Sequence, residues 1–454
     1  MSEHELQPYR IGCGAGFAGD RIDAAQAVVA ALAEANGPAC LIFEMLAERT
    51  LALAQLDRAA GRPGYDATIL DRLAPVLEIC LERGIRIVGN FGAAAPEAAA
   101  RAILDLAGEL GCRMPRIAVV EGDDLMGPEA DPGAAALLAA CLPDAAAPMS
   151  ANVYLGAAEI AAALRDGADI VVTGRVADPA LALGPLVAHY GWCLDDHDRI
   201  AAGTMVGHLL ECGAQVSGGY FADPGYKDVP GLHEIGFPIA EVARDGGCVI
   251  TKPAGSGGLV DTRSVTEQLL YEIHDPAAYL TPDVILDLSD VDLVQEGLDR
   301  VRLSGARGHP APETLKSTVC YAGGHLGEAE ISYAGPNAQR RARAALEAVT
   351  RRLPEGLDWR GDLIGAISVF GDDDNAHLCA EWEDADDIRL RLAVSAPDRA
   401  EVERAMHEFG ALYTCGPAGG AGLRVSIRPR VYTGAALIPR RMVRPSWRFV
   451  EAAA

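Results

Sequence analysis

The chain has 454 residues and a formal net charge of −25 at pH 7, and half of its residues are hydrophobic. This length predicts two or three domains, and the acidic balance argues against binding to nucleic acid or to an anionic membrane, which both attract basic surfaces. The eleven cysteines show no CxxC spacing, the N-terminal segment lacks an apolar signal region, and no apolar run approaches membrane-spanning length. We therefore expect a cytoplasmic protein with reduced thiols.

Five short apolar segments alternate with helical patterns in the first 193 residues. They are Tyr9–Cys13, Ala39–Phe43, Gly84–Gly89, Arg116–Val120 and Asp169–Thr173. Alternation of this kind builds βαβ units and a parallel sheet. We expect an α/β fold with a doubly wound, Rossmann-like, mostly parallel sheet in the N-terminal half, followed by α+β segments. The predicted domains are a Rossmann-like domain at 1–193, a loop-rich α+β domain completing the site at 194–355, and a small α+β unit at 356–454.

A glycine-rich loop follows the first predicted strand. Gly14, Gly16 and Gly19 fit the GxGxxG pattern, and Glu44 ends the second strand. This is the outline of a dinucleotide-binding fingerprint. Asp20 weighs against it, because a pyrophosphate needs the positive field of the helix start for itself. As an N-cap, Asp20 would instead satisfy the amides there. The loop is kept as a candidate substrate-binding segment.

Two acidic residues open the next predicted helix. Glu44 and Glu48 are one turn apart, so both carboxylates are expected to face one way. Two close, partly dry carboxylates can raise one pKa and create a general acid. The alternative is a solvated first turn stabilised by the helix dipole. Asn90 ends the third strand and is expected at the same edge of the sheet.

The fifth predicted strand ends in Arg175, followed by Asp178. A guanidinium at a strand end can bind a substrate carboxylate or phosphate through two parallel hydrogen bonds. Asp178 would orient it or act as a base, and the alternative is that the two merely pair to hold the loop. Lys252 precedes a glycine-rich run at residues 255–258 and could hold a phosphate or an enolate.

Polar residues lie along one face of a helix that is predicted within the segment from Thr204 to Gly225. They are Thr204, His208, Glu211 and Gln215, whose spacings of four, three and four place them on one helix face. We expect this segment to close over the carboxyl edge of the sheet, with His208 moving protons near neutral pH. A metal is not favoured, and its weak candidate ligands are His208, Glu211 and Asp223.

Blocks spread along the chain resemble the acyclic terpene utilisation protein A family. They include IGCGAGFAGDRIDAA, LIFEMLAERTLALA, GADIVVTGRVADPALALGPL, VITKPAGSGGLV and LIPRRMV. The resemblance covers almost the whole chain. It implies a link to citronellol and geraniol catabolism, beside a carboxylase of a terpenoid acyl-CoA, without implying a reaction. Many relatives carry an extra C-terminal ferredoxin-like domain, which this chain is expected to lack.

Three functional hypotheses follow. The first is an enzyme acting on a small carboxylate or acyl-CoA by lyase or hydratase chemistry. Such a reaction needs a paired acid and base, drawn from Glu44, Glu48, Asp178, His208 and Glu211. The alternatives are a nucleotide-dependent oxidoreductase and a non-catalytic partner subunit of an acyl-CoA carboxylase pathway. No cofactor is favoured, with a divalent metal or a nucleotide kept as options. A homo-oligomer is expected, because the later apolar strands are too short to close cores alone.

Overall fold

The computed structural model describes residues 7–128, 130–142, 147–369 and 385–451. Contacts divide the chain into two compact units: unit 1 is Met1–Cys320 with Thr433–Ala454, and unit 2 is Tyr321–Tyr432. Two long strands, β14 (Thr314–Ala334) and β17 (Ala421–Pro439), cross the boundary between the units. The division into three domains at residues 193 and 355 stays a prediction. Residues 1–6, part of the N-terminal segment considered above, lie outside the described residues.

Unit 1 is built on a parallel sheet in which all five predicted strands are found. They are β1 (Tyr9–Ala15), β2 (Ala39–Phe43), β3 (Arg86–Gly89), β6 (Ile170–Thr173) and β4 (Ile117–Glu121), hydrogen-bonded in that order. Their side chains are buried almost without interruption, as expected for parallel strands covered on both faces. The carboxyl ends of these strands therefore meet at one edge of the sheet.

Antiparallel strands extend this sheet on both sides. Among the described residues it has ten strands in the order β11-β12-β8-β7-β1-β2-β3-β6-β4-β18. The added strands are β7 (Ile239–Val242), β8 (Cys248–Thr251), β12 (Arg300–Ser304), β11 (Asp292–Gly297) and β18 (Ser446–Phe449). A smaller sheet contains β13 (Arg307–His309), β10 (Ile285–Asp287) and β9 (Tyr279–Leu280), and β5 (Pro148–Val153) pairs with β14. The fold is thus mixed α/β, and a doubly wound, Rossmann-like arrangement stays a prediction.

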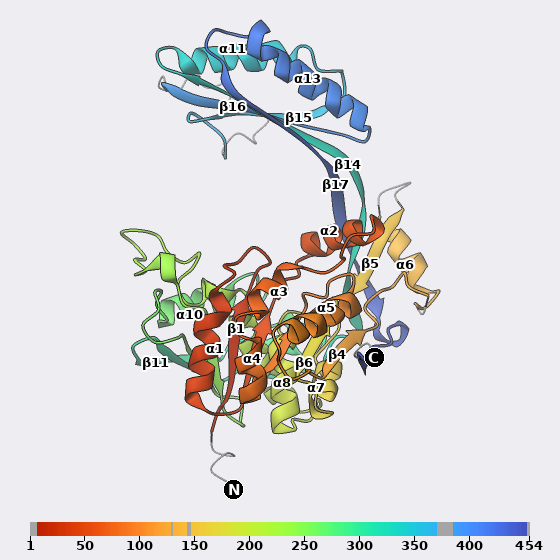
Figure 1. The fold of residues 1–454 in the computed structure, drawn as a ribbon, viewed down its shortest axis with the longest axis vertical. Helices are drawn as coiled ribbons and strands as arrows, with labels where there is room; N and C mark the ends of the chain where they lie inside the picture. Colours follow the sequence, from red (N-terminus) through yellow and green to blue (C-terminus); the bar gives the residue numbers. More distant parts are fainter. Residues whose placement is uncertain (1–6, 129, 143–146, 370–384, 452–454) are drawn as a thin grey trace. The chain divides into compact units, whose positions relative to one another are not determined.

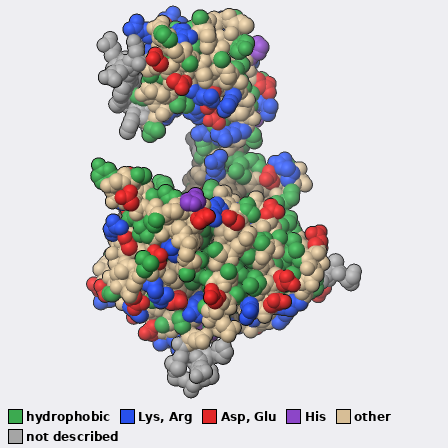
Figure 2. All heavy atoms as spheres, turned by 60° about the vertical axis from the view of Figure 1, so that its left-hand side comes forward, with side chains coloured by type: hydrophobic (Ala, Val, Ile, Leu, Met, Phe, Trp, Pro, Cys, Tyr) green, Lys and Arg blue, Asp and Glu red, His purple; other side chains and the backbone are tan. Residues whose placement is uncertain are grey.

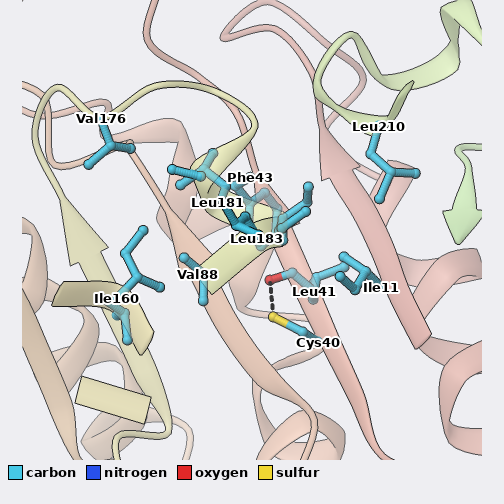
Figure 3. Packing of buried hydrophobic residues seen from close by; sticks show 14 of the residues in the cluster. Ile11, Cys40, Leu41, Phe43, Val88, Ile160, Val176, Leu181, Leu183 and Leu210 are labelled. Atoms are coloured by element: carbon cyan, nitrogen blue, oxygen red, sulfur yellow. Dashed lines mark hydrogen bonds between the residues drawn. The ribbon is translucent and has the colours of Figure 1, made fainter. Parts of the chain in front are cut away.

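The helices of unit 1 pack on the parallel strands in two groups. One group contains α1 (Ala24–Ala35), α3 (Thr68–Leu73), α4 (Leu77–Arg83) and α5 (Pro96–Glu109), and the other contains α7 (Ala158–Arg165), α8 (Ala180–Tyr190) and α9 (His197–Glu211). The other described helices are α2 (Glu48–Ala59), α6 (Ala134–Ala140), α10 (Thr262–Leu270), η2 (Gly213–Gln215), η3 (Leu232–Glu234) and η4 (Arg440–Met442). Figure 3 shows Leu181 and Leu183 of α8 lying among Leu41 and Val88 of the strands. In the described part of the chain, no helix is long and apolar enough to cross a membrane.

The described elements of unit 2 run β14, α11 (Ala338–Thr350), β15 (Asp358–Ile364), β16 (Asp387–Ala396), α13 (Arg399–Cys415) and β17. Among its described residues, unit 2 contains the antiparallel strands β15, β16, β14 and β17, with α11 and α13 on one face (Figure 1). This βαββαβ order, with the strands arranged β15-β16-β14-β17, is the split βαβ topology of ferredoxin-like domains. Alternate residues of β16 are buried against the helices, so one face of the sheet forms the core.

Candidate functional site

A cavity of about 990 Å³ lies in unit 1 at the carboxyl ends of β1, β2 and β6. The Gly16–Asp20 loop, the start of α2, the Arg175–Asp178 loop and the end of α9 all contribute to its wall. Its titratable side chains are those of Asp20, Glu44, Glu48, Tyr154, Arg175, Asp178, His208, Glu211, Cys212, Tyr220, Tyr271, Glu272, Tyr279 and Lys316. The structure thus brings together the strand ends and the helix end on which the sequence analysis placed the site.

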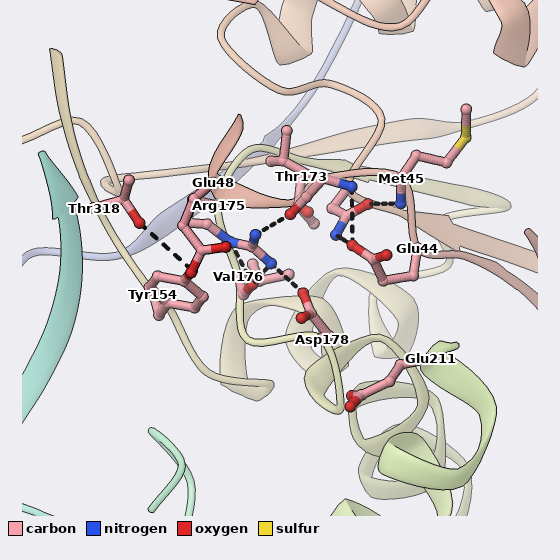
Figure 4. A network of polar contacts seen from close by, with 12 residues as sticks. Glu44, Met45, Glu48, Tyr154, Thr173, Arg175, Val176, Asp178, Glu211 and Thr318 are labelled. Carbon is pink, nitrogen blue, oxygen red and sulfur yellow. Dashed lines mark hydrogen bonds and ion pairs between the residues drawn. The ribbon is translucent and has the colours of Figure 1, made fainter. Parts of the chain in front are cut away.

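Arg175 is the buried centre of this polar network (Figure 4), with only 1% of its surface exposed. Its guanidinium donates to the carbonyl oxygens of Val176 and Leu46 and to the carboxylate of Asp178. It also lies over the ring of Tyr154, 4.4 Å from the ring centre. Burial lowers the pKa of Arg175, but the charges of Asp178, Tyr154 and Glu44 and the hydrogen bond to Asp178 together outweigh it, and the pKa is raised. Most of the guanidinium donors are therefore used within the protein.

Glu48 forms an ion pair with Lys316 on the same wall of the cavity as Arg175. The Tyr154 hydroxyl donates to Glu48 Oε1 (2.6 Å), and Lys316 Nζ donates to the same oxygen (3.0 Å). Burial raises the pKa of Glu48, but the hydrogen bonds from Tyr154 and Lys316 lower it to about 2. The Glu48 carboxylate is therefore ionised throughout the physiological range.

Glu44 has the opposite electrostatic environment. Its Oε1 accepts hydrogen bonds from the Leu46 amide and from Asn90 Nδ2, each 2.9 Å long. Burial and then the negative charge of Asp178 raise the pKa of Glu44 to about 8, against the opposing charge of Arg175. The expected helical pair of Glu44 and Glu48 is wrong, because α2 begins at Glu48 and Glu44 lies in the extended segment after β2. Both residues nevertheless line the cavity.

Asp178 links these groups. Burial raises its pKa, while Arg175 lowers it through charge and a hydrogen bond, and the net shift is upward. Asn90 does not line the cavity, since its side chain donates to Glu44 and its Oδ1 accepts from the Met45 amide (2.7 Å). Asn90 is therefore placed to orient Glu44.

A second acid–base pair lies on the wall formed by the end of α9. His208 Nδ1 and Glu211 Oε1 are 2.8 Å apart, and the second carboxylate oxygen, Glu211 Oε2, is buried without a hydrogen-bond partner. Burial, together with the charges of Asp178 and Glu272, raises the pKa of Glu211 to about 7 despite His208. Burial lowers the pKa of His208, but the charge of Glu211, its hydrogen bond and the backbone carbonyls nearby together outweigh it, and the net shift is upward. This pair is thus poised to exchange a proton near neutral pH.

The glycine loop is held by contacts within the protein. Asp20 is not an N-cap as expected, because α1 begins at Ala24, and it instead accepts a hydrogen bond from the Gly16 amide (2.8 Å). A side chain at Gly16 would collide with the backbone of Cys212 and Gly213 at the end of α9. Of the three glycines, only Gly16 lines the cavity.

The other two glycines pack against aromatic rings. A Cβ at Gly14 would meet the ring of Phe43, and one at Gly19 would meet the ring of Phe17. The buried Arg72 also donates to the carbonyl oxygens of Ala18 and Asp20. Gly14 and Gly16 therefore have packing reasons that need no nucleotide, whereas Gly19 meets only the exposed ring of Phe17.

Thr204, Lys252 and Asp223 do not line the cavity, and Gln215 lines it from outside the expected helix. The hydroxyl of Thr204 donates to the Ile200 carbonyl (2.8 Å) and is buried within α9. The expected single helix face is wrong for Gln215, because α9 ends at Glu211 and Gln215 belongs to η2, although it still lines the cavity. Lys252 pairs with Asp299 (3.1 Å) and donates to the Ser256 carbonyl (2.8 Å). Asp223 lies in a turn closed by Lys227.

Sequence reasoning missed the aromatic and basic residues of the cavity. They are Tyr154, Tyr220, Tyr271, Tyr279 and Lys316, with the acidic Glu272. Tyr220 and Glu272 have left-handed backbone angles, with φ of 59° and 57°, which non-glycine residues adopt only at a cost. The strings SGGY and LLYEIHDP mark these turns, but their approach to Glu211 depends on tertiary contacts that no local pattern encodes.

Acidic groups outnumber basic ones in the cavity. Six carboxyl groups line it, from Asp20, Glu44, Glu48, Asp178, Glu211 and Glu272, against the permanent cations Arg175 and Lys316. Within the described residues, no group of three or more histidine, cysteine, aspartate or glutamate side chains could hold a metal ion. Burial raises the pKa of two of these carboxyl groups, Glu44 to about 8 and Glu211 to about 7.

The structure is that of a mixed α/β protein with an acid-rich cavity at the carboxyl ends of its parallel strands. The family model described as "Acyclic terpene utilisation family protein AtuA" matches residues 9–449, and the chain therefore belongs to that family. No curated protein and no solved structure matches the chain.

Proposed function

We propose that this protein is an enzyme of small-molecule catabolism that acts on a small carboxylate or acyl-CoA by acid–base chemistry of the lyase or hydratase type. The observation that carries the proposal is a set of carboxyl groups in one cavity whose pKa values differ widely. Glu44 has a pKa near 8, Glu211 near 7 and Glu48 near 2. Carboxyl pairs separated in this way divide the acid and base roles in known active sites.

In the hydration direction, Glu44 enters protonated and Glu211 enters ionised. Glu211 takes a proton from water, the hydroxyl bonds to the β-carbon of an unsaturated acyl group, and Glu44 protonates the α-carbon. The developing enolate charge lies near Lys316, the less buried of the two permanent cations. His208 accepts the hydrogen bond or proton that holds Glu211 in place.

The same contacts support further parts of the proposal. Arg175 positions Asp178 and the Leu46 carbonyl rather than binding the substrate directly. The nucleotide-dependent alternative has less support, because Asp20 and the packing contacts account for the glycine loop. A cytoplasmic location is supported by the free cysteines of the described residues. A homo-oligomer remains part of the proposal.

The experiment is an assay of hydration and elimination on branched enoyl and hydroxyacyl thioesters, followed by loss or gain of the enoyl absorbance. We expect a pH optimum of activity between the two pKa values, at roughly pH 7 to 8. Glu44→Gln and Glu211→Gln should each lower kcat about a hundredfold or more. Full activity in both variants would overturn the assignment. Failure of the wild type on every thioester, together with copurification of a carboxylase subunit, would favour the non-catalytic alternative.

A further inference from the structure

We propose that two copies of this protein pair through strand β17 of unit 2, each strand extending the other copy's sheet about a two-fold axis at Val425. This states where the homo-oligomer proposed above forms, and it does not depend on the proposed reaction. Three features of β17 lead to it: an open strand edge, an exposed apolar row beside a groove, and a residue order that is complementary to itself.

β17 is the outer strand of the unit 2 sheet. In the described part of the chain the order is β15-β16-β14-β17, so one edge of β17 is bonded to β14 and the other has no neighbour. Pro429 fixes the direction of the backbone groups, because a proline inside a strand is tolerated where its nitrogen faces the open edge. Backbone groups alternate between the two edges, so Leu423, Val425 and Ile427 also direct their N–H and C=O groups outward. Such an open row of donors and acceptors is a template for another strand.

The same residues form an apolar row on the face of the sheet that α13 covers. Ile427 packs against the core of unit 2, whereas Leu423 is 37% exposed and Val425 is 48% exposed. A groove of about 470 Å³ lies between this row and α13, and Gly410 of α13 has open space where a side chain would stand. A second strand beside β17 would cover the row and close the groove, which removes apolar surface from water.

The residue order selects a second copy of β17 as the partner. The strand begins at Ala421, and Pro429 stands at the same distance beyond Val425. Antiparallel pairing centred on Val425 therefore sets Leu423 opposite Ile427 of the partner subunit, so that the apolar rows meet. Pro429 then falls opposite Ala421 of the partner subunit, and its missing N–H lies at the end of the paired segment rather than within it.

The charged face of β17 fits this register and not its neighbour. Arg428 pairs with Glu328 at 2.9 Å, so Arg424, two positions further along the alternation, lies on the same face as Glu328. Within the described residues Arg424 forms no ion pair. Centring on Val425 sets Arg424 opposite the small Ser426 of the partner subunit, which leaves room to reach the partner subunit's Glu328. Centring on Ser426 would set Arg424 against Arg428 of the partner subunit, and like charges directly opposite are destabilising.

The first test is the mass of the full chain at micromolar concentration, measured by sedimentation equilibrium. The wild type should be a dimer. Val425→Lys sets two cations together at the two-fold axis and should raise the dissociation constant at least about a hundredfold, while unfolding in urea stays cooperative. Ile364→Lys, at the opposite edge strand of the same sheet, should leave the dimer intact. A dimer that survives Val425→Lys or is lost in Ile364→Lys would overturn the proposal, and a monomeric wild type would show that Pro429 and the arginines keep this edge unpaired.

Cysteine cross-linking tests the register and serves if Val425→Lys fails to fold. It uses a background in which the exposed Cys193 and Cys415 are replaced by serine. Opposed residues of an antiparallel pair have Cα atoms about 5 Å apart, within reach of a disulfide, so Val425→Cys should give a covalent dimer under mild oxidation. Leu423→Cys alone should not, because the two copies of residue 423 lie roughly 13 Å apart along the strands. A mixture of Leu423→Cys and Ile427→Cys chains should cross-link as a heterodimer.

Cross-linking of Leu423→Cys alone, or none at Val425→Cys, would overturn the pairing. Turnover of thioesters by these variants bears on the proposed reaction only, since β17 of unit 2 contributes no group to the acid–base chemistry proposed above. Failure of the reaction and failure of the pairing are therefore told apart by separate measurements.

Discussion

The cavity of unit 1 and the sheet of unit 2 both concentrate charged side chains, but they satisfy them differently. On the face of the sheet opposite the buried Leu390 and Leu392, arginines pair with carboxylates in a ladder (the residues Arg360, Arg389, Arg391 and Arg428 with Glu328, Glu330 and Asp362). In this ladder every carboxylate has an arginine partner. In the cavity the carboxyl groups outnumber the cations, and one buried oxygen has no partner.

This difference separates charged groups that stabilise a surface from charged groups that could take part in acid–base chemistry. Most side chains of the ladder are partly exposed. Burial lowers the pKa of Arg391, but the hydrogen bonds to Glu328 and Asp362 and their charges together raise it. Such pairs stabilise a sheet surface modestly. In the cavity, burial raises the pKa of Glu44 and Glu211 into the range where they exchange protons at neutral pH. Figure 2 shows acidic and basic side chains interspersed over the visible surface, so surface charge alone would not single out the cavity.

The largest expected effect concerns Arg175. Replacing it with methionine leaves the Leu46 and Val176 carbonyl oxygens and the Asp178 carboxylate without their buried donor. Removing one partner from a buried pair typically costs about 3–5 kcal/mol. We expect Arg175→Met to lower the free energy of unfolding by that amount in urea titrations. Arg175→Lys should recover only part of it, because one ammonium cannot reach all three acceptors.

Arg391→Met is the matched change in the ladder. Arg391 has two carboxylate partners, and its own side chain is 27% exposed. When it is replaced, the partly exposed Glu328 keeps Arg428 as a partner and the buried Asp362 keeps Arg360. We expect a loss of about 1 kcal/mol. Equal losses for Arg175→Met and Arg391→Met would break the distinction between the two regions.

Much of the parallel sheet could be predicted from the sequence, because continuous apolar runs ending in glycine mark buried strands. The same logic placed Arg175, Asp178 and Glu44 at one edge. Asp20 and Glu48 line the cavity as well, but the helix starts were wrong: α1 begins at Ala24 rather than at Asp20, and α2 begins at Glu48 rather than at Glu44, since cap preferences constrain helix starts only weakly. Lys316 and Tyr279 reach the cavity from strands that are distant in sequence, and no local pattern predicts that approach.

The second prediction concerns the pH dependence of stability. The pKa of Glu44 is about 8 in the folded chain, against an ordinary value of about 4.3 for glutamate, so the folded state binds more protons between these pH values. Stability should therefore fall as the pH rises from about 4.5 to 8. Glu44→Gln removes this titration, so its free energy of unfolding in urea should depend less on pH. Between pH 4.5 and pH 8 the variant should therefore lose less stability than the wild type does.

Glu48→Gln provides a control of opposite sign. The pKa of Glu48 is lowered to about 2, so its contribution is present above its ordinary pKa and is lost only as the pH falls through 2. This variant should therefore be destabilised equally at pH 5 and pH 8. An unchanged pH slope in Glu44→Gln would show that burial does not hold that carboxyl in its protonated form.

The smallest expected effect is the coupling between Arg389 and Glu330 in the ladder. Their charged atoms lie 2.6 Å apart, and about a third of each side chain is exposed. A double-mutant cycle with Arg389→Met and Glu330→Gln should give a coupling of less than about 1 kcal/mol, because water and side-chain entropy offset the attraction. Added salt should reduce it, since the Debye length falls from about 10 Å at 0.1 M to about 3 Å at 1 M. The coupling between Arg175 and Asp178 should change much less with salt, because Arg175 is buried. A coupling between Arg389 and Glu330 that is large and insensitive to salt would contradict this distinction. It would show that the ion pairs of the ladder behave like the buried pair of Arg175 and Asp178 and not like surface ion pairs.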